Sequence, residues 1–299
     1  MHPYGALFGG VLGMTEVDGH GISGLEWGWN RAGDHSEPLR TTLDIQVQKA
    51  AAASLQSAMT QANAAAGAAI VMNMNGEILG MVSLPDADPA SREMFLPHRA
   101  SASLYEMGDL SRLFVSALQF SVPGAPQSTF VSPHGMGARL GLRNRAALPI
   151  EAGTPFINAH PLHRAFDLGK DIATTPIQVA AAIVALINGG EYHQPTLVLP
   201  DTGREPPGRE VVLLPEMSAA LREEIGDGMT GVAQKVINGA YSPDHLVATP
   251  VAVFPVAAPQ LLVCILLDDP NPANAAAIRA VVLQTVMKTG ASVERLTPQ

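Results

Sequence analysis

The sequence has very little of several features that particular protein classes need. Cys264 is the one cysteine among 299 residues, which excludes an intrachain disulfide, a CxxC redox pair and a thiolate metal cluster. Charged residues make up only 15%, and 18 Lys and Arg against 27 Asp and Glu leave no basic surface for nucleic acid or anionic membrane. No apolar run reaches the roughly 18 residues of a membrane span, and no signal-peptide pattern follows Met1. The sequence therefore predicts a soluble chain.

What the chain does contain is a large apolar fraction. Hydrophobic residues are 47% of the total, enough for a substantial core, and the length fits one large domain with a small appendage. Residues 1–40 are glycine-rich and carry both tryptophans, Trp27 and Trp29, without a helical repeat of apolar positions. We expect them to form a short extended lead segment, and residues 41–299 to form the main domain.

Local patterns in the main domain predict helices and strands in a mixed order. Asn75-Gly76 separates two apolar runs and is typical of a two-residue hairpin turn, in which both residues have positive φ. Gly and Pro punctuation marks several helix ends. Helices are predicted at 43–65, 110–120, 176–187, 218–224 and 274–288, and strands at 68–74, 77–84, 231–236, 246–254 and 261–267. This order predicts an α+β fold in which an antiparallel sheet joins both halves of the sequence.

Several segments resemble the transpeptidase domain of class B penicillin-binding proteins. Tyr105-Glu106-Met107-Gly108 is similar to the Tyr-Glu-Pro-Gly that precedes the catalytic serine in that family, and the order and spacing fit from about residue 40 to 270. Even the lead segment resembles the end of the family's N-terminal pedestal. The other matching segments are 43–48, 76–86, 175–180 with 188–190, and 228–235.

The resemblance implies a penicillin-binding-protein/β-lactamase-like transpeptidase fold. It implies a five-stranded antiparallel sheet with helices on its faces and a reduced helical subdomain, preceded by a pedestal remnant at residues 1–40. Members of the family lie outside the cytoplasmic membrane on an N-terminal anchor. A periplasmic or cell-envelope location is therefore expected, although neither a signal nor an anchor is recognisable in this sequence.

The family's acyl transfer needs three sequence elements. Ser-x-x-Lys supplies the nucleophile and the base that activates it, one helical turn apart. Ser-x-Asn relays the proton. Lys-Thr-Gly on an edge strand binds the substrate carboxylate, and backbone N–H groups at the serine and just after Lys-Thr-Gly form the oxyanion hole.

This sequence departs from the family at all three elements. Asp109 and Arg112 stand where the serine and lysine of the first element are expected, and an arginine cannot act as a base at neutral pH. No Ser-x-Asn occurs between residues 121 and 160. In the third element Met229 replaces the lysine before Thr230 and Gly231. By position, the oxyanion-hole backbone groups belong to Asp109 and Val232.

These losses indicate a pseudoenzyme, a catalytically inactive domain with a binding or scaffold role in peptidoglycan assembly or cell division. Its partners are then a peptidoglycan stem peptide or cell-wall synthesis proteins. An active acyl transferase or hydrolase with a rebuilt site, using Ser111 or Thr230, is the alternative, and a remnant without a selected function is a third.

Asp109 also has a structural interpretation, and so do three short motifs that match functional patterns only by their letters. Asp109 precedes an apolar helix and suits an N-cap, where Arg112 could form an i,i+3 ion pair with it. Gly19-x-Gly21-x-x-Gly24 matches a dinucleotide fingerprint, but neither a strand nor a helix is expected around it. His160 and His163 flank Pro161 without a supporting helix, and Lys288-Thr289-Gly290 falls at a predicted helix end. No cofactor and no metal are therefore expected.

Overall fold

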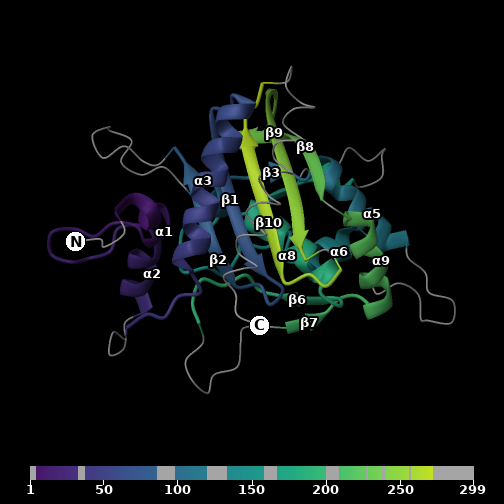
Figure 1. Ribbon diagram of the computed structural model, residues 1–299, viewed down its shortest axis with the longest axis horizontal. Helices are drawn as coiled ribbons and strands as arrows, with labels where there is room; N and C mark the ends of the chain where they lie inside the picture. The colour runs from purple at the N-terminus through teal and green to yellow at the C-terminus, as the bar shows by residue number, and fades with distance from the viewer. Residues whose placement is uncertain are drawn as a thin grey trace.

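The computed structural model describes residues 5–32, 38–85, 98–119, 133–157, 167–199, 209–226, 228–237, 240–255 and 257–271 (Figure 1). The predicted helix at 274–288, the His160–His163 pair and Lys288-Thr289-Gly290 lie outside these residues. The helices are η1 Gly5–Phe8, α1 Gly9–Leu12, α2 Gly24–Ala32, α3 Ile45–Ala62, α4 Arg99–Ala102, η2 Gly108–Leu110, α5 Ser111–Gln119, α6 Pro133–Arg139, α7 Leu168–Asp171, α8 Pro176–Ile187 and α9 Pro215–Ile225. The strands are β1 Ala66–Asn73, β2 Ile78–Leu84, β3 Tyr105–Glu106, β4 Phe156–Ile157, β5 Ile172–Thr174, β6 Glu191–His193, β7 Arg209–Val211, β8 Met229–Ile237, β9 Ala240–Phe254 and β10 Leu261–Asp268.

One antiparallel sheet organises the molecule. Its strand order is β2-β1-β10-β9-β8-β3-β5-β4, while β6 and β7 form a separate pair. The first hairpin therefore pairs with the last strands of the sequence, with Ile70 of β1 opposite Cys264 of β10. This confirms the predicted α+β fold and the sharing of one sheet by both halves of the chain. The short strands β3, β5 and β4 extend the five expected strands on one side.

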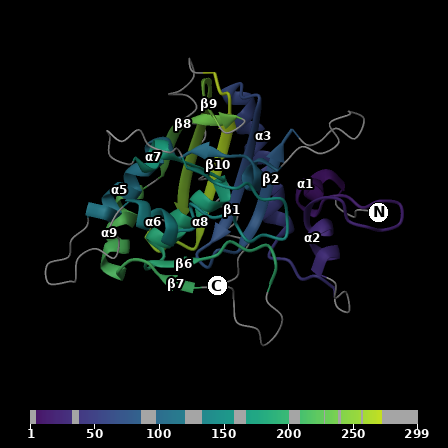
Figure 2. The same ribbon diagram turned by 180° about the vertical axis from the view of Figure 1, so that it is seen from behind.

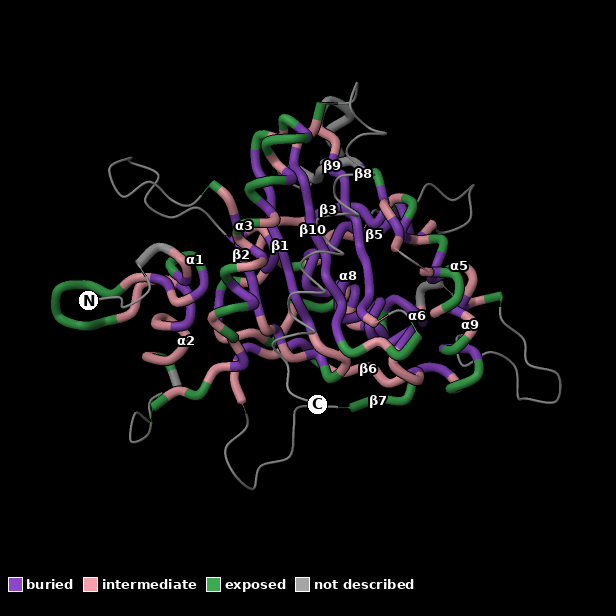
Figure 3. Tube along the Cα trace, viewed as in Figure 1, coloured by how far each residue is buried: buried purple, intermediate pink, exposed green. Residues whose placement is uncertain are grey.

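The central strands are buried on both faces because helices cover both. Alternate residues of a strand point to opposite faces. In β1, Ala68, Ile70 and Met72 join a core with α8, whereas Ala69 and Val71 join a second core with α3. Figures 1 and 2 show α3 on one face and α8 on the other, and Figure 3 shows the buried strands between them. This explains why β1 and β10 are continuous apolar runs rather than alternating ones.

Helix α8 is the centre of the larger core. All of its 12 residues are buried, and it spans Pro176–Ile187 as predicted. The Thr175 side chain accepts a hydrogen bond from the backbone N–H of Gln178 and so caps the helix, while Pro176 occupies the first turn. Helix α3 is capped in the same way by Asp44, which accepts from Gln46 and Val47. Within the described residues, no helix is both long enough and apolar enough to cross a membrane.

Two local predictions are wrong. The β1–β2 hairpin forms, but its turn has four residues between Asn73 and Ile78, and Asn75 does not adopt positive φ. The Asn73 side chain accepts from the backbone of Asn75 and Glu77, at 3.0 Å each, and this wraps the longer turn.

The lead segment is also not extended, since η1, α1 and α2 lie within residues 5–32. Tertiary contacts hold these short helices: Val11 and Leu25 are buried in the larger core. The backbone N–H of Gly24, at the start of α2, points at the Glu151 carboxylate, with distances of 3.3 and 3.4 Å to its two oxygens. Contacts across the fold, rather than a repeat in the local sequence, select the helical conformation here.

The outer edge of the sheet, at β2, is closed by a side chain. Gln48 of α3 is fully buried, and its amide pairs with Met81 of β2 in both directions. Nε2 donates to the Met81 carbonyl at 2.8 Å, and Oε1 accepts the Met81 N–H at 2.7 Å. Nε2 also donates to the Leu7 carbonyl at 2.9 Å. The amide thus imitates a neighbouring strand and attaches the N-terminal segment to the sheet, which protects an edge that would otherwise be open to association.

Replacing Gln48 with leucine should expose this role. Gln48→Leu keeps the volume but leaves the Met81 N–H and carbonyl buried without partners, so we expect a loss of about 2–4 kcal/mol in the free energy of unfolding. Urea denaturation measures this loss, and light scattering should show concentration-dependent association through β2. Gln56→Leu, on the exposed side of the same helix, is the matched control and should change stability by less than about 0.5 kcal/mol. Equal stabilities for the two variants would contradict the edge-closing role.

Candidate functional site

The turn that carries Asp109 lies directly on strand β8. Tyr105 of β3 pairs with Lys235 of β8, and the chain then turns through Met107 and Gly108 into η2. Gly108 has φ 51°, and its Cα is so close to the Val232 carbonyl oxygen that no side chain would fit between them. Glycine is therefore required here both for its conformation and for its size. The result is a backbone-to-backbone contact between the turn and the strand.

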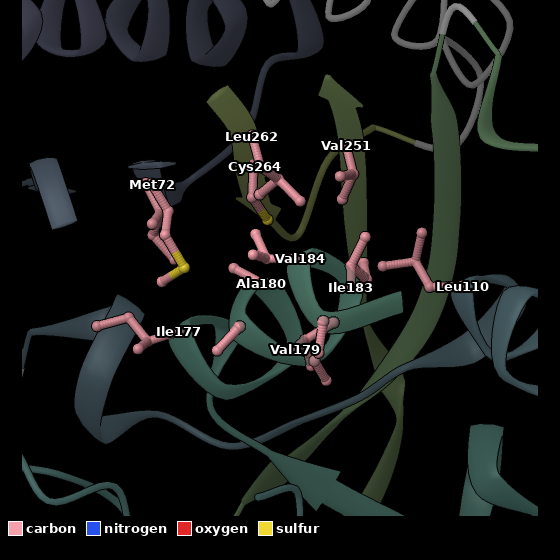
Figure 4. Close-up of a cluster of buried hydrophobic side chains, with 14 of the residues drawn as sticks. Met72, Leu110, Ile177, Val179, Ala180, Ile183, Val184, Val251, Leu262 and Cys264 are labelled. Carbon is pink, nitrogen blue, oxygen red and sulfur yellow. The ribbon is translucent and has the colours of Figure 1, made fainter. Parts of the chain in front are cut away.

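A second glycine makes the same contact from the strand side. A Cβ on Gly231 would lie 2.8 Å from Leu110 Cγ and 3.1 Å from the Met107 carbonyl oxygen. Figure 4 shows Leu110 pointing into the core formed by α8 and the central strands. Gly231 thus allows Leu110 to anchor η2 against β8. Close packing of β8 against η2 therefore requires a glycine at this strand position.

The structure places Asp109 and Arg112 at the surface. Asp109 is the middle residue of the 3-10 turn η2, and the side chain of the preceding N-cap residue, Met107, makes no capping hydrogen bond. The predicted N-cap role of Asp109 is therefore wrong, because the helix begins one residue earlier, at Gly108. The predicted ion pair with Arg112 is also not formed: Arg112 Nε donates to the Asp109 backbone carbonyl at 3.4 Å, and the two exposed side chains make no salt bridge with each other.

Three side chains of β8 meet different surroundings. Met229 is only 7% exposed and belongs to the apolar core on the α8 side of the sheet. Thr230 is half-buried, and its Oγ1 atom is enclosed without a hydrogen-bond partner among the described residues. Val232 is 49% exposed. The family resemblance implies a lysine at position 229. The structure has the uncharged side chain of Met229 there, packed in the core.

Ser111, the alternative nucleophile, faces a different neighbour. A Cβ on Gly169 of α7 would lie 2.7 Å from Ser111 Oγ and 2.9 Å from the Gly108 carbonyl oxygen. The serine hydroxyl thus lies against α7, where glycine leaves room for it. Lys170 is the nearest lysine along α7, and its exposed side chain is 4.0 Å from the Asp167 carboxylate. This arrangement does not provide Ser111 with the buried neutral amine that would activate it.

A polar cluster, which sequence reasoning missed, lies behind the turn. Tyr105 OH donates to Asp268 Oδ2 at 3.5 Å, and Arg99 Nε is 3.9 Å from the same oxygen. Burial, together with the charge of Asp268, raises the pKa of the Tyr105 hydroxyl well above its usual value. The cluster joins β3 to the end of β10, residues 163 positions apart in sequence. No short-range spacing signals such a contact, because it depends on the pairing of distant strands.

The glycine motif Gly19-x-Gly21-x-x-Gly24 lies in a setting that does not suit a dinucleotide. Gly24 does open helix α2, contrary to expectation, but this helix start faces the Glu151 carboxylate, which would repel a dinucleotide phosphate. Thr15 and Gly21 form only an isolated bridge before it. Within the described part of the chain, three or more His, Cys, Asp or Glu side chains do not gather in a metal-binding group.

Comparison with known proteins gives curated relatives of one kind. The chain is 26% identical over 364 residues to the Caulobacter vibrioides protein named "Probable peptidoglycan D,D-transpeptidase FtsI", covering 91% of this chain and 61% of the relative. It is 23% identical over 386 residues to stage V sporulation protein D of Bacillus subtilis, covering 90% and 60%. The chain thus spans about three fifths of these relatives. No family model matches it.

Solved structures agree on the fold. Penicillin-binding protein 3 of Mycobacterium tuberculosis superimposes with a TM-score of 0.75 at 18% identity, over 96% of this chain and 90% of that one. A peptidoglycan synthetase of Bifidobacterium adolescentis gives a TM-score of 0.78 at 15% identity, over 100% and 74%. The chain is therefore similar in sequence to proteins named as peptidoglycan D,D-transpeptidases, and its fold is that of penicillin-binding-protein transpeptidase domains.

Proposed function

We propose that this chain is a catalytically inactive penicillin-binding-protein-like domain that serves as a binding or scaffold module in peptidoglycan assembly or cell division. The observation that carries the proposal is Asp109, which takes the serine's position on a turn whose contact with β8 is intact. The names of the curated relatives support a setting in peptidoglycan synthesis and sporulation.

The chemistry of Asp109 and Arg112 argues against acyl transfer. A carboxylate attacking an acyl carbonyl would form a mixed anhydride, which hydrolyses readily and stores an acyl group poorly. A guanidinium stays protonated at neutral pH, so Arg112 cannot act as the base. In serine hydrolases the loss of nucleophile or base alone lowers kcat by about 10⁶. Both functions are replaced here.

Met229 removes the third function, carboxylate binding by a strand cation. Its side chain is packed in the apolar core, so this position contributes stability rather than charge. The backbone proposed for the oxyanion hole is a separate matter: the close approach of Gly108 to the Val232 carbonyl oxygen supports an intact backbone around Asp109 and Val232. We therefore propose that the chain still binds a carbonyl-containing ligand although it does not catalyse acyl transfer.

A rebuilt active site is the second candidate, and Thr230 is the residue that favours it. Its Oγ1 atom has no hydrogen-bond partner among the described residues, and because the atom is enclosed, a substrate could reach it only after the surrounding residues move. Ser111 is disfavoured by its position against Gly169. If a rebuilt site exists, an acyl group should therefore be found on Thr230.

Incubation with a fluorescent penicillin tests the two candidates directly. We expect no stable adduct by intact-mass spectrometry, because neither an activated nucleophile nor a base is present at Asp109 and Arg112. An active class B penicillin-binding protein treated in parallel provides the positive control. A mass increase of one penicillin, located on any residue by peptide mapping, would disprove catalytic inactivity, and location on Thr230 would establish the second candidate.

Restoring the family's residues tests whether the remaining backbone still supports acylation. The triple variant Asp109→Ser, Arg112→Lys and Met229→Lys regains the nucleophile, its base and the strand cation. We expect slow acylation by a strained β-lactam but no measurable turnover of a D-Ala-D-Ala peptide, since a missing proton relay typically costs 10²- to 10⁴-fold. The rates are measured by stopped-flow fluorescence and by D-alanine release.

A stability control must accompany this variant. Met229→Lys places an ammonium at a nearly buried position, so the triple variant should unfold at lower urea concentration than the double variant Asp109→Ser, Arg112→Lys. Acylation is therefore compared only between variants that remain folded by circular dichroism. Rapid peptide turnover by the folded triple variant would show that another residue supplies the relay.

A further inference from the structure

His98 has an unusual environment for a titratable side chain. It precedes α4 and is only 6% exposed. Neither ring nitrogen makes a hydrogen bond of normal geometry with the described residues. The Met81 backbone lies close enough to favour the protonated ring, but its carbonyl already accepts from Gln48 at 2.8 Å. A buried imidazole without partners carries a cost that natural proteins seldom keep without compensation.

The helix and strands packed against α4 offer no countercharge: α8, β1 and β2 contact α4, and none of them contains a titratable side chain. The segment around Gly153 also packs against α4, since the Gly153 N–H donates to the Ser101 carbonyl at 2.8 Å, and its carboxylate, that of Glu151, accepts from the Gly24 N–H. The charged neighbour on α4 itself is Arg99, which opposes a second positive charge. Beyond it lie Tyr105 and Glu106 of β3 and Asp268 of β10, and Asp268 already contacts both Arg99 and Tyr105.

We propose that His98 is an acid-sensitive switch, in which protonation of the buried ring unseats α4 and loosens the Tyr105–Leu110 turn of the candidate site. The physical cause is the balance of charges: a protonated His98 adds a second cation next to Arg99, and Asp268, the carboxylate beside Arg99, already contacts Tyr105. A protonated ring must then move to water, and α4 must move with it, because His98 is the N-cap residue whose carbonyl accepts the first backbone hydrogen bonds of the helix.

The backbone connects His98 to the candidate site over a short distance. The His98 carbonyl accepts from the N–H groups of Ser101 and Ala102, at 3.0 and 2.8 Å, and so begins α4. Only Ser103 and Leu104 separate α4 from β3, which leads into the η2 turn. Movement of α4 is therefore transmitted to Tyr105, whose bond to Asp268 holds the start of the turn.

The direction of the pH effect follows from the environment of the ring. Burial lowers the pKa of His98 to about 4, against about 6.5 for an exposed imidazole. In the open form α4 has moved and the His98 ring is in water, whereas in the closed form the ring is buried. The open form therefore takes up a proton first as the pH falls below about 6.5. Opening becomes more favourable by up to about tenfold per pH unit until about pH 4, and the closed form is fully favoured above that window.

Amide hydrogen exchange of the full chain tests the switch. Residues 99–110 should exchange faster as the pH falls from 6.5 to 4.5, by up to about 100-fold after correction for intrinsic exchange. In His98→Phe, which keeps a planar ring without a proton site, this acid response should be absent. His98→Gln, a neutral polar replacement, serves the same purpose if the phenylalanine variant does not fold.

His245→Gln is the matched control. His245 is half-exposed and its Nδ1 is 2.9 Å from Asp269, so removing it should leave the acid response of residues 99–110 unchanged. The switch is disproved if the His98 variants keep the acid response of the natural chain, or if the natural chain shows none between pH 6.5 and 4.5. Loss of the response in the His98 variants alone supports it.

Discussion

The close approach of the Gly108 turn to strand β8 is the contact on which both the fold and the candidate site depend. It joins the turn after β3 to a strand more than a hundred residues later, and it requires glycine on each side, at Gly108 and at Gly231. Leu110 fills the space beside Gly231 and fixes η2 in the core. Because the contact is between backbones, it is insensitive to the side chains that point away from it.

Because of this property, the side chains at positions 109 and 112 can differ from those of the family without disturbing the contact between the turn and β8. Asp109 and Arg112 are exposed and do not pack in the core, so substitution there costs little stability. Met229 is different, since a methionine in a core position stabilises the protein where a buried cation would cost free energy. The proposed loss of catalytic function at these positions would therefore cost little stability, or would increase it. The glycines, whose replacement would separate the turn from the strand, are retained.

The sequence was most informative where local chemistry decides structure. Thr175-Pro176 and Asn188-Gly189 set both ends of α8, and the bounds of that helix were predicted to the residue. Strands β1 and β10 were recognised because they are apolar on both faces. The four-residue turn after Asn73 was missed because a side-chain bond outweighs the preference of Asn-Gly, and α2 was missed because Glu151 and the core stabilise it from far along the chain.

The polar contacts that could not be predicted share one purpose. A sheet built from two distant halves of a chain has no short loop to set how those halves meet, so their alignment must come from side chains that recognise particular partners. Asp268 with Tyr105 and Arg99 does this at the end of β10, whereas Gln48 with Met81 fixes α3 against the outer edge of β2 within the first half of the chain. Apolar packing alone would tolerate a displaced strand, whereas these buried polar groups would lose their partners. A displaced β10 would break the contacts of Asp268 with Tyr105 and Arg99, so this cluster fixes how the two halves of the sheet meet.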